Sequence, residues 1–266
     1  MTAQTNTEDD VVQVRREGEH IAVVTLNRPH RRNAINGALA QALDRTVKAL
    51  EADPAVRAVI LTAAGRQAFC AGADLKEMVA GADAASRSTP DGGFAGFVFA
   101  PRRKLWIAAV NGPAVAGGFE LVLACDMAIA STDAHFSLPE VSRGLVASAG
   151  GVFRLPRVLP RGVAIEIIAA GGSLDARRAA ELGLVNRAVA PDELMPEALR
   201  IATRAAANAP LAVQGSLEVA RRAHDTDEAE LRRHAHEVAE RIFESEDARE
   251  GPRAFAEHRA PLWRGR

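Results

Sequence analysis

Apolar and polar positions alternate in short blocks through the first half of the chain, and this pattern predicts strands. Val11–Arg15 and Ile21–Leu26 read as two strands joined by the turn Glu17-Gly18-Glu19. Three later runs of β-branched and other apolar residues predict further short strands: Val56–Thr62, Trp106–Val110 and Met127–Ala130. These runs place the predicted sheet in the first half of the chain.

Helical spacing separates the strands and then takes over. In Asn36–Ala52, apolar residues recur every three or four positions from Leu39 to Leu50, and the pattern ends before Asp53-Pro54. Strands that alternate with helices favour an α/β arrangement with crossover connections. From Arg161 onward strand signals nearly vanish, and the following segments read as helices: Glu193–Asn208, Leu211–His224, Glu228–Phe243 and Ala248–Arg259. The sequence thus predicts an α/β core followed by a helical tail.

One segment shows neither the strand pattern nor the helix pattern. Gly81–Gly96 is rich in Gly, Ala, Ser and Asp and shows little periodicity. It is compatible with a loose surface loop, and also with a mobile flap over a site.

Composition narrows the function classes. The chain has 266 residues, 48% hydrophobic and 25% charged, which is ordinary for a soluble globular protein with a substantial core. A formal net charge of −1 gives no reason to expect nucleic acid or an anionic membrane as a partner. No uncharged apolar run reaches the ~18 residues of a membrane span, and Met1–Asp10 is polar, so we expect a cytoplasmic protein. Cys70 and Cys125 are too few for a disulfide framework, and no Cys or His tract suggests a metal.

Two glutamates carry the most chemical information, because each closes a stretch suited to hold a developing anion. Glu120 follows Gly117-Gly118, and Glu140 follows Leu138-Pro139. The glycine pair lacks the spacing of a phosphate-binding loop or a dinucleotide fingerprint, which argues against a nucleotide site. It instead predicts a strand-to-helix turn that exposes backbone N–H groups at the positive end of a helix. Two carboxylates beside small-residue turns suit proton transfer next to a carbonyl whose oxygen becomes an oxyanion.

Each motif also has a purely structural interpretation. Glu120 alone is compatible with an acidic residue that stabilises a helix N-terminus, and Pro139-Glu140 with an ordinary helix start. Asp74 beside Lys76 is compatible with a surface pair or a helix cap. Cys70 is more typical of a small buried cysteine than of a nucleophile. The order of the motifs, more than any one of them, supports an enzyme.

In that order the motifs resemble those of the crotonase (enoyl-CoA hydratase/isomerase) superfamily over nearly the whole chain. The resemblance rests on Leu26-Asn27-Arg28-Pro29, Ala71-Gly72-Ala73-Asp74-Leu75-Lys76, Ala109-Val110-Asn111-Gly112, Gly117-Gly118-Phe119-Glu120-Leu121, Pro139-Glu140-Val141, Glu181-Leu182-Gly183-Leu184-Val185 and Glu250-Gly251-Pro252. It implies an α/β fold, with a crotonase-type spiral of ββα units over residues 1–195 as the acyl-CoA-binding and catalytic core. Residues 196–266 would then form a C-terminal helical region that packs a homotrimer or a dimer of trimers.

The resemblance also implies an acyl-CoA site. The backbone N–H groups of Ala73 and Gly117 would form the oxyanion hole for the thioester oxygen. The residues expected to contact the substrate and its CoA are Arg28, Ala34, Ala71, Ala73, Asp74, Leu75, Lys76, Gly117, Gly118, Phe255 and His258. His258 stands where the family often has a lysine that helps bind CoA phosphates in a neighbouring subunit. No metal is expected, and no cofactor beyond the CoA moiety of the substrate.

Family hydratases use two glutamates, and Glu120 and Glu140 fill both positions here. We therefore expect a hydro-lyase that adds water reversibly across the 2,3 double bond of an enoyl-CoA thioester. Glu120 would activate the water and Glu140 would deliver the proton to Cα. Two alternatives stay open: an enoyl-CoA isomerase, which would use one glutamate, and a non-catalytic acyl-CoA-binding protein.

Within the superfamily the chain is similar to the carnitinyl-CoA dehydratase branch, in Gly92-Gly93-Phe94-Ala95-Gly96 and in the tail from Ser245 onward. This similarity makes crotonobetainyl-CoA a candidate substrate. Ala73 stands where that branch carries a bulky aromatic residue, and Ala116 replaces a usual glycine. Ordinary enoyl chains are therefore equally admissible.

Overall fold

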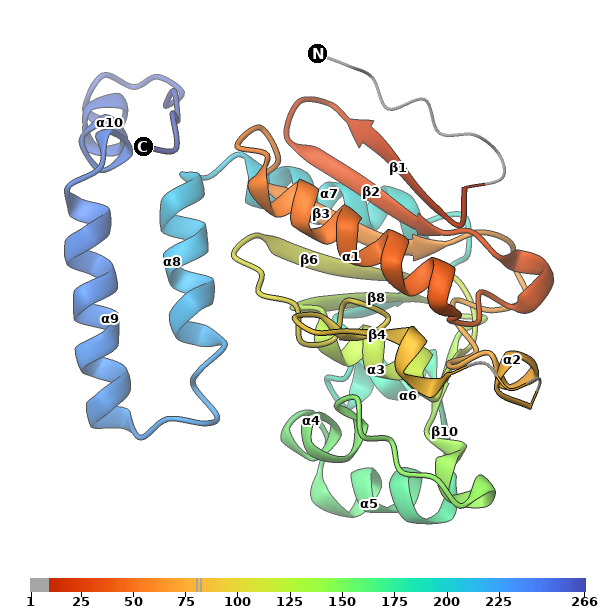
Figure 1. Ribbon diagram of the computed structural model, residues 1–266. Coiled ribbons are helices and arrows are strands. Elements are labelled where there is room, and N and C mark those ends of the chain that lie inside the picture. Colours follow the sequence, from red (N-terminus) through yellow and green to blue (C-terminus); the bar gives the residue numbers. More distant parts are fainter. Residues whose placement is uncertain (1–9, 80, 82) are drawn as a thin grey trace.

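The computed structural model describes residues 10–79, 81 and 83–266 and is organised around a six-stranded sheet (Figure 1). The strands, in their spatial order, are β1 (Val12–Glu17), β2 (Ile21–Leu26), β3 (Ala58–Ala63), β6 (Leu105–Val110), β8 (Met127–Ser131) and β11 (Arg187–Val189). β1 and β2 form an antiparallel hairpin, and all the other neighbours in this sheet are parallel. The strands predicted from the apolar runs are confirmed. β11 was not predicted, because three residues show no usable alternation.

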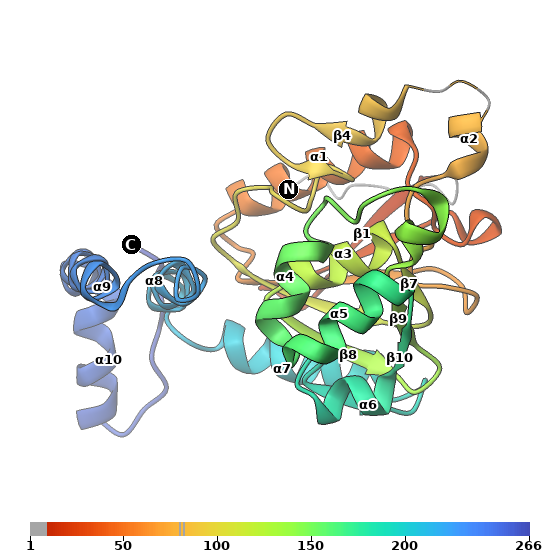
Figure 2. The ribbon, with the colours of Figure 1, turned by 90° about the horizontal axis from the view of Figure 1, so that it is seen from below.

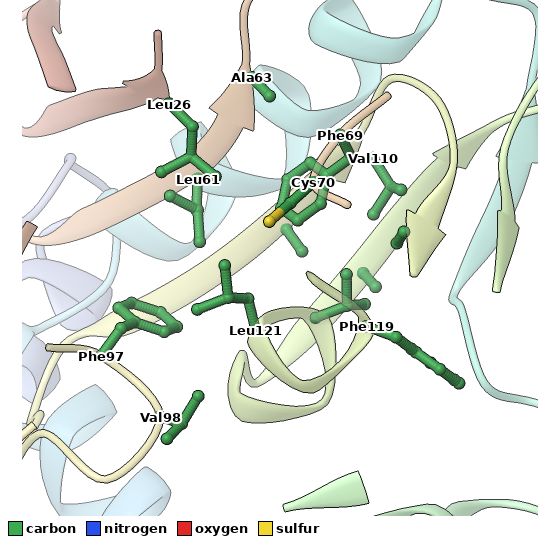
Figure 3. Packing of buried hydrophobic residues seen from close by; sticks show 14 of the residues in the cluster. Leu26, Leu61, Ala63, Phe69, Cys70, Phe97, Val98, Val110, Phe119 and Leu121 are labelled. Carbon is green, nitrogen blue, oxygen red and sulfur yellow. The ribbon is translucent and has the colours of Figure 1, made fainter. Parts of the chain in front are cut away.

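Helices cover both faces of this sheet. On one face α7 (Leu194–Ala206) packs its buried alanines against side chains such as Ile60 and Ile107. On the other face lie α1 (Gly37–Ala52) and α3 (Gly117–Ala124), and Figure 1 shows α1 and α7 on opposite sides of the strands. Figure 3 shows Leu61 and Leu121 within this second layer, which includes strand, helix and loop residues. Burial on both faces explains why the central strands read as continuous apolar runs.

A small second sheet positions the two glutamates. It contains β7 (Ala114–Val115), β9 (His135–Ser137) and β10 (Ser173–Asp175), surrounded by α4 (Gly151–Val158), α5 (Arg161–Ala170) and α6 (Ala176–Glu181) (Figure 2). β7 and β9 are parallel neighbours. β7 runs into α3, which carries Glu120, and β9 runs into the 3₁₀ helix η3 (Pro139–Arg143), which carries Glu140. The parallel pairing therefore brings the two carboxyl-bearing segments to the same edge.

The segment predicted as a loop is structured in its described part. After α2 (Leu75–Val79), a 3₁₀ turn η2 (Ala84–Arg87) leads into β4 (Ser88–Thr89), which pairs antiparallel with β5 (Gly93–Phe94). The Thr89 hydroxyl donates to the Asp44 carboxylate of α1 at 2.8 Å. The interpretation as a loose surface loop is wrong for residues 84–96, whereas residue 82 lies outside the described residues. Whether this hairpin moves as a flap stays a prediction.

The helical tail stands apart from the sheet. α8 (Pro210–Ala220) and α9 (Glu228–Phe243) lie side by side and α10 (Glu246–Ala256) follows at their end (Figures 1 and 2). Exposed apolar side chains include Phe243, Phe255 and Leu262. Trp263 donates its indole N–H to the Ala207 carbonyl of the same chain at 2.8 Å. Assembly through this tail stays a prediction.

The proposed boundary between residues 195 and 196 falls within the first turn of α7. In the described part of the chain, no helix is long and apolar enough to cross a membrane.

Candidate active site

A cavity of about 410 Å³ opens where α3, η3 and the β4–β5 hairpin meet. Its walls are formed by Ala71, Ala73, Leu75, Arg87, Ser88, Gly93, Phe94, Phe99, Val115, Ala116, Gly117, Glu120, Pro139, Glu140, Arg143, Leu145, Val146, Ser148 and Ala149. Six of the residues predicted from the sequence are in this set: Ala71, Ala73, Leu75, Gly117, Glu120 and Glu140. Both glutamates and both small-residue turns therefore face one cavity.

The two turns approach each other closely because of Gly72. This glycine has φ +83°, and a Cβ there would lie 2.9 Å from the Ala116 Cβ and 3.0 Å from the Gly117 nitrogen. A larger residue would push the turns apart. On its other side, the Gly72 carbonyl accepts a hydrogen bond from the Ile35 N–H at 2.8 Å. The loop is thus fixed between Ile35 and the start of α3.

This arrangement leaves two backbone donors free at the cavity. Among the hydrogen bonds of the described residues, neither the Ala73 N–H nor the Gly117 N–H has an acceptor. Gly117 is the first residue of α3, where the N–H groups have no partner within the helix. Two unpaired backbone N–H groups in the wall of one cavity can together bind a negatively charged or strongly polar oxygen.

Glycines let α3 begin in contact with its neighbours. A Cβ at Gly118 would lie 2.1 Å from the Cys70 carbonyl oxygen, and one at Gly117 would lie 2.4 Å from the Phe94 ring. Gly118 therefore serves close packing and does not line the cavity. Cys70 is fully buried and burial raises the pKa of its thiol to about 12, which confirms the interpretation of a buried cysteine over that of a nucleophile.

Glu120 is a buried carboxyl group in an environment that favours its neutral form. It is 4% exposed, and its Oε1 accepts a hydrogen bond from the Gly151 N–H at 2.9 Å. Burial raises its pKa to about 7, and the nearby charge of Glu140 adds to the rise. A residue that only stabilised a helix N-terminus would be exposed and ionised. The purely structural interpretation therefore does not fit Glu120.

Glu140 lies at the start of η3 and is half-buried. Its Oε2 is buried without a hydrogen-bond partner among the described residues, and burial raises the pKa of this carboxyl group as well. Two neighbouring carboxyl groups with raised pKa values titrate as a pair. Such a pair can hold one proton and one negative charge near neutral pH, which is what combined acid and base catalysis requires.

Other predicted residues lie outside the cavity walls. Arg28 and Asp74 are both buried and form an ion pair at 3.1 Å, and the Arg28 guanidinium also donates to the Ala34 carbonyl. The interpretation of Asp74 as a surface pair with Lys76 is therefore wrong, because its partner is Arg28. The contacts between Arg28, Ala34 and Asp74 hold the loop that carries Ala73 in place.

The remaining predicted contacts are exposed. Lys76 lies at the surface on α2. Phe255 is on α10 and His258 follows that helix, and neither side chain lines the cavity within the chain. Their predicted CoA contacts would require a neighbouring subunit.

Sequence reasoning missed several wall residues. Arg87 lies in a segment without periodicity, and nothing in its neighbours marked it. Phe94 was part of a quoted motif but had no assigned role. Gly151 does not line the cavity, but its donation to Glu120 was also not predicted. These roles depend on contacts between distant segments.

The fold and site define an α/β protein of the crotonase type, with two carboxyl groups and free N–H donors in one cavity. Comparison with known proteins agrees. A family model described as enoyl-CoA hydratase/isomerase matches residues 16–266. Carnitinyl-CoA dehydratase of Proteus mirabilis is 40% identical over 248 residues, 91% of this chain and 94% of that protein.

Solved structures give the same result. An enoyl-CoA hydratase from Mycobacterium tuberculosis has a TM-score of 0.91 at 38% identity, covering 97% of this chain and 100% of that one. A carnitinyl-CoA hydratase from Mycobacterium avium is 45% identical with a TM-score of 0.77, covering 97% and 99%. The chain belongs to the enoyl-CoA hydratase/isomerase family, and these similarities support a hydro-lyase.

Proposed function

We propose that the protein is an enoyl-CoA hydratase, which adds water reversibly across the 2,3 double bond of an enoyl-CoA thioester. The observation that carries the proposal is the shared cavity, in which Glu120 and Glu140 lie with the free N–H groups of Ala73 and Gly117. Addition of water to a conjugated thioester needs one group to take a proton, one to give a proton, and donors for the oxygen that becomes negative.

The N–H groups of Ala73 and Gly117 act as the oxyanion hole in this proposal. Negative charge develops on the thioester oxygen when hydroxide adds to Cβ, and two fixed donors stabilise it. Loss of one such donor typically lowers kcat about 10²- to 10³-fold. Both donors belong to the backbone, so the small residues around them serve to place the N–H groups.

The two carboxyl groups take different roles. Glu120 activates the water, because burial raises its pKa to about 7, which makes its carboxylate a stronger base than an ordinary glutamate, while the Gly151 N–H holds its Oε1 in place. Glu140 delivers the proton to Cα. Its Oε2 is buried without a hydrogen-bond partner among the described residues, which favours the protonated form of this carboxyl group. In the dehydration direction the same groups exchange roles.

The CoA moiety is proposed to lie along Ala71–Lys76, with Phe255 and His258 contributing from a neighbouring subunit of a trimer or dimer of trimers. No cofactor beyond the CoA moiety is needed for this chemistry. We propose a cytoplasmic enzyme. The similarity to carnitinyl-CoA dehydratase keeps crotonobetainyl-CoA as one candidate substrate beside ordinary short enoyl-CoA.

The test is an assay of the purified protein on crotonyl-CoA and crotonobetainyl-CoA, following loss of the conjugated thioester absorbance in ¹⁸O-labelled water. A hydratase incorporates one labelled oxygen per substrate consumed. Movement of the double bond without labelled oxygen would identify an isomerase, and binding without turnover would identify a non-catalytic protein.

Single variants test the two carboxyl groups. Glu120→Gln and Glu140→Gln should each lower kcat at least about 100-fold, since each removes a group needed for proton transfer. Asp133→Asn, an exposed carboxyl outside the cavity, is the matched control and should keep full activity. A glutamine variant with more than about a tenth of the wild-type rate would make that glutamate a spectator.

A further inference from the structure

Arg87 is a buried cation without a partner among the residues that the structure describes. Its side chain is 5% exposed and lines the cavity. Its Nη1 is buried with no hydrogen-bond partner, and within the described residues the guanidinium makes no ion pair or hydrogen bond. Burial of an unpaired charge is costly, and buried arginines are ordinarily paired.

Other arginines in the fold show the usual arrangement. Arg28, also buried, pairs with Asp74 and donates to a carbonyl. Arg154 has an unpartnered Nη1 too, but its Nη2 donates to the Val98 carbonyl at 2.6 Å. Arg87 has neither kind of contact. Its missing partner is therefore expected to be something that enters the cavity.

Backbone hydrogen bonds hold Arg87 in the cavity wall. Its carbonyl accepts from the Ala95 N–H at 2.8 Å, and the next residue, Ser88, pairs with Phe94. The Phe94 ring in turn packs on Gly117, where the thioester oxygen is proposed to bind. The hairpin that carries Arg87 therefore covers the acyl side of the site.

The protein's own carboxylates near this hairpin are already engaged. Asp44 binds Thr89 of the same hairpin but has its ion pair with Lys48 at 2.9 Å. Among the cavity walls the carboxyl groups are Glu120 and Glu140, which form no ion pair with Arg87 and are assigned to catalysis above. A carboxylate supplied by the substrate would fill the gap.

We propose that Arg87 binds a carboxylate at the distal end of the acyl group, so that the preferred substrates are enoyl-CoA thioesters of dicarboxylic acids. This inference rests on the proposed function. Arginine presents a planar set of donors that matches a carboxylate with two parallel hydrogen bonds. The interaction would pair the Arg87 charge, which is buried in the cavity wall, with an opposite charge.

The same charge disfavours a quaternary ammonium group. Aromatic faces are the usual means by which proteins recognise such a group. The aromatic residues in the cavity walls are Phe94 and Phe99, and the Phe99 ring already has the Arg154 guanidinium 5.3 Å from its centroid. The trimethylammonium group of crotonobetainyl-CoA would meet Arg87 as a like charge, so of the candidate substrates proposed above it should bind the more weakly.

Calorimetric binding of three non-reactive acyl-CoA thioesters of nearly identical shape tests the proposal. Glutaryl-CoA ends in a carboxylate, 5-methylhexanoyl-CoA carries an isopropyl group in its place, and 4-trimethylammoniobutanoyl-CoA carries the cation. Wild-type protein should bind glutaryl-CoA about 10- to 100-fold more tightly than the isopropyl analogue, because a hydrogen-bonded pair of charges is worth about that much. The cationic analogue should bind most weakly.

Two variants test whether Arg87 causes the preference for the carboxylate-bearing thioester. Arg87→Gln should abolish the difference between glutaryl-CoA and the isopropyl analogue, and Arg87→Lys should keep part of it. Arg45→Gln removes the same charge from the exposed side of α1 and should change nothing. Because the guanidinium of Arg87 has no partner in the described part of the chain, Arg87→Gln should melt no lower than wild type without ligand.

Three results would overturn the proposal. One is a wild-type protein without preference for glutaryl-CoA. Another is an equal loss of affinity for all three thioesters and for free CoA in Arg87→Gln, which would assign Arg87 to a CoA phosphate. The third is a lower melting temperature with an unchanged preference, which would make Arg87 structural. These binding measurements need no turnover, so they can be interpreted even if the protein shows no hydratase activity.

Discussion

Replacement of Glu120 by glutamine should make the protein more stable while it removes the activity. The side chain is buried, and burial raises its pKa from the ordinary 4.5 to about 7. The native state therefore disfavours the negative charge that the unfolded chain carries freely above pH 4.5. Glutamine keeps an oxygen that can accept from the Gly151 N–H, but it never ionises.

The sign and size follow from proton linkage. Below pH 4.5 the Glu120 carboxyl group is protonated in both the folded and the unfolded wild type, so it does not lower the free energy of unfolding. As pH rises from 4.5 to 7 the unfolded state loses its proton first, so wild-type stability falls. One pKa unit corresponds to about 1.4 kcal/mol, and the full rise to about 7 corresponds to about 3 kcal/mol. Glu120→Gln should thus gain up to about 3 kcal/mol over wild type above pH 7.

Urea unfolding of both proteins, at one fixed protein concentration and at several pH values from 5 to 8, measures this difference. The concentration is fixed because any subunit association adds to apparent stability. Asp133→Asn, at an exposed position, should show a difference that does not change with pH. A constant free-energy difference for Glu120→Gln across this range would refute the reasoning, because it would mean that the Glu120 pKa is not raised.

Three further predictions concern the turn and the tail. Gly117→Ala should lower kcat at least about tenfold, because its Cβ would lie 2.4 Å from the Phe94 ring. Gly162→Ala has open space around it and should keep full activity, and equal kcat values for the two variants would show that Gly117 is not needed for catalysis. Ala116 has φ +55°, so Ala116→Gly should raise the free energy of unfolding by about 1 kcal/mol, and a decrease would show that this backbone is not strained. Phe255 is 83% exposed, so Phe255→Ser should weaken assembly by light scattering; a monomeric wild type would contradict this.

The parts of the fold predicted from sequence are those with a long enough pattern. β3 and β6 are buried on both faces, so they appear as continuous apolar runs. α9 extends from Glu228 to Phe243, as its spacing predicts. β10 and β11 have three residues each, too few for alternation to show, and their pairing with distant strands is what forms them. Tertiary contacts, rather than local preference, decide such elements.

The site divides in a similar way. Glu120 and Glu140 were identified because they stand in motifs whose order is distinctive. Burial and the raised pKa values depend on where β7 and β9 bring those motifs together, which no single stretch encodes. Arg87 was missed for the same reason, since a charged residue in an aperiodic segment is usually solvated. Only the pairing of β4 with β5 and the packing on α1 place it in the cavity wall.

Three unfavourable features of the described structure lie around one cavity, and this bears on whether the protein is a catalyst or only a binder. Glu120 is buried with a raised pKa, Ala116 has a strained backbone, and Arg87 is buried without a partner within residues 10–79, 81 and 83–266. Each costs stability, and a passive scaffold gains nothing by retaining them together. An acyl-CoA binder would profit from Arg87 and from the free N–H groups, but not from a pair of carboxyl groups poised to exchange a proton. The raised pKa of Glu120 therefore favours catalysis, and its removal by glutamine is the change that should separate stability from activity.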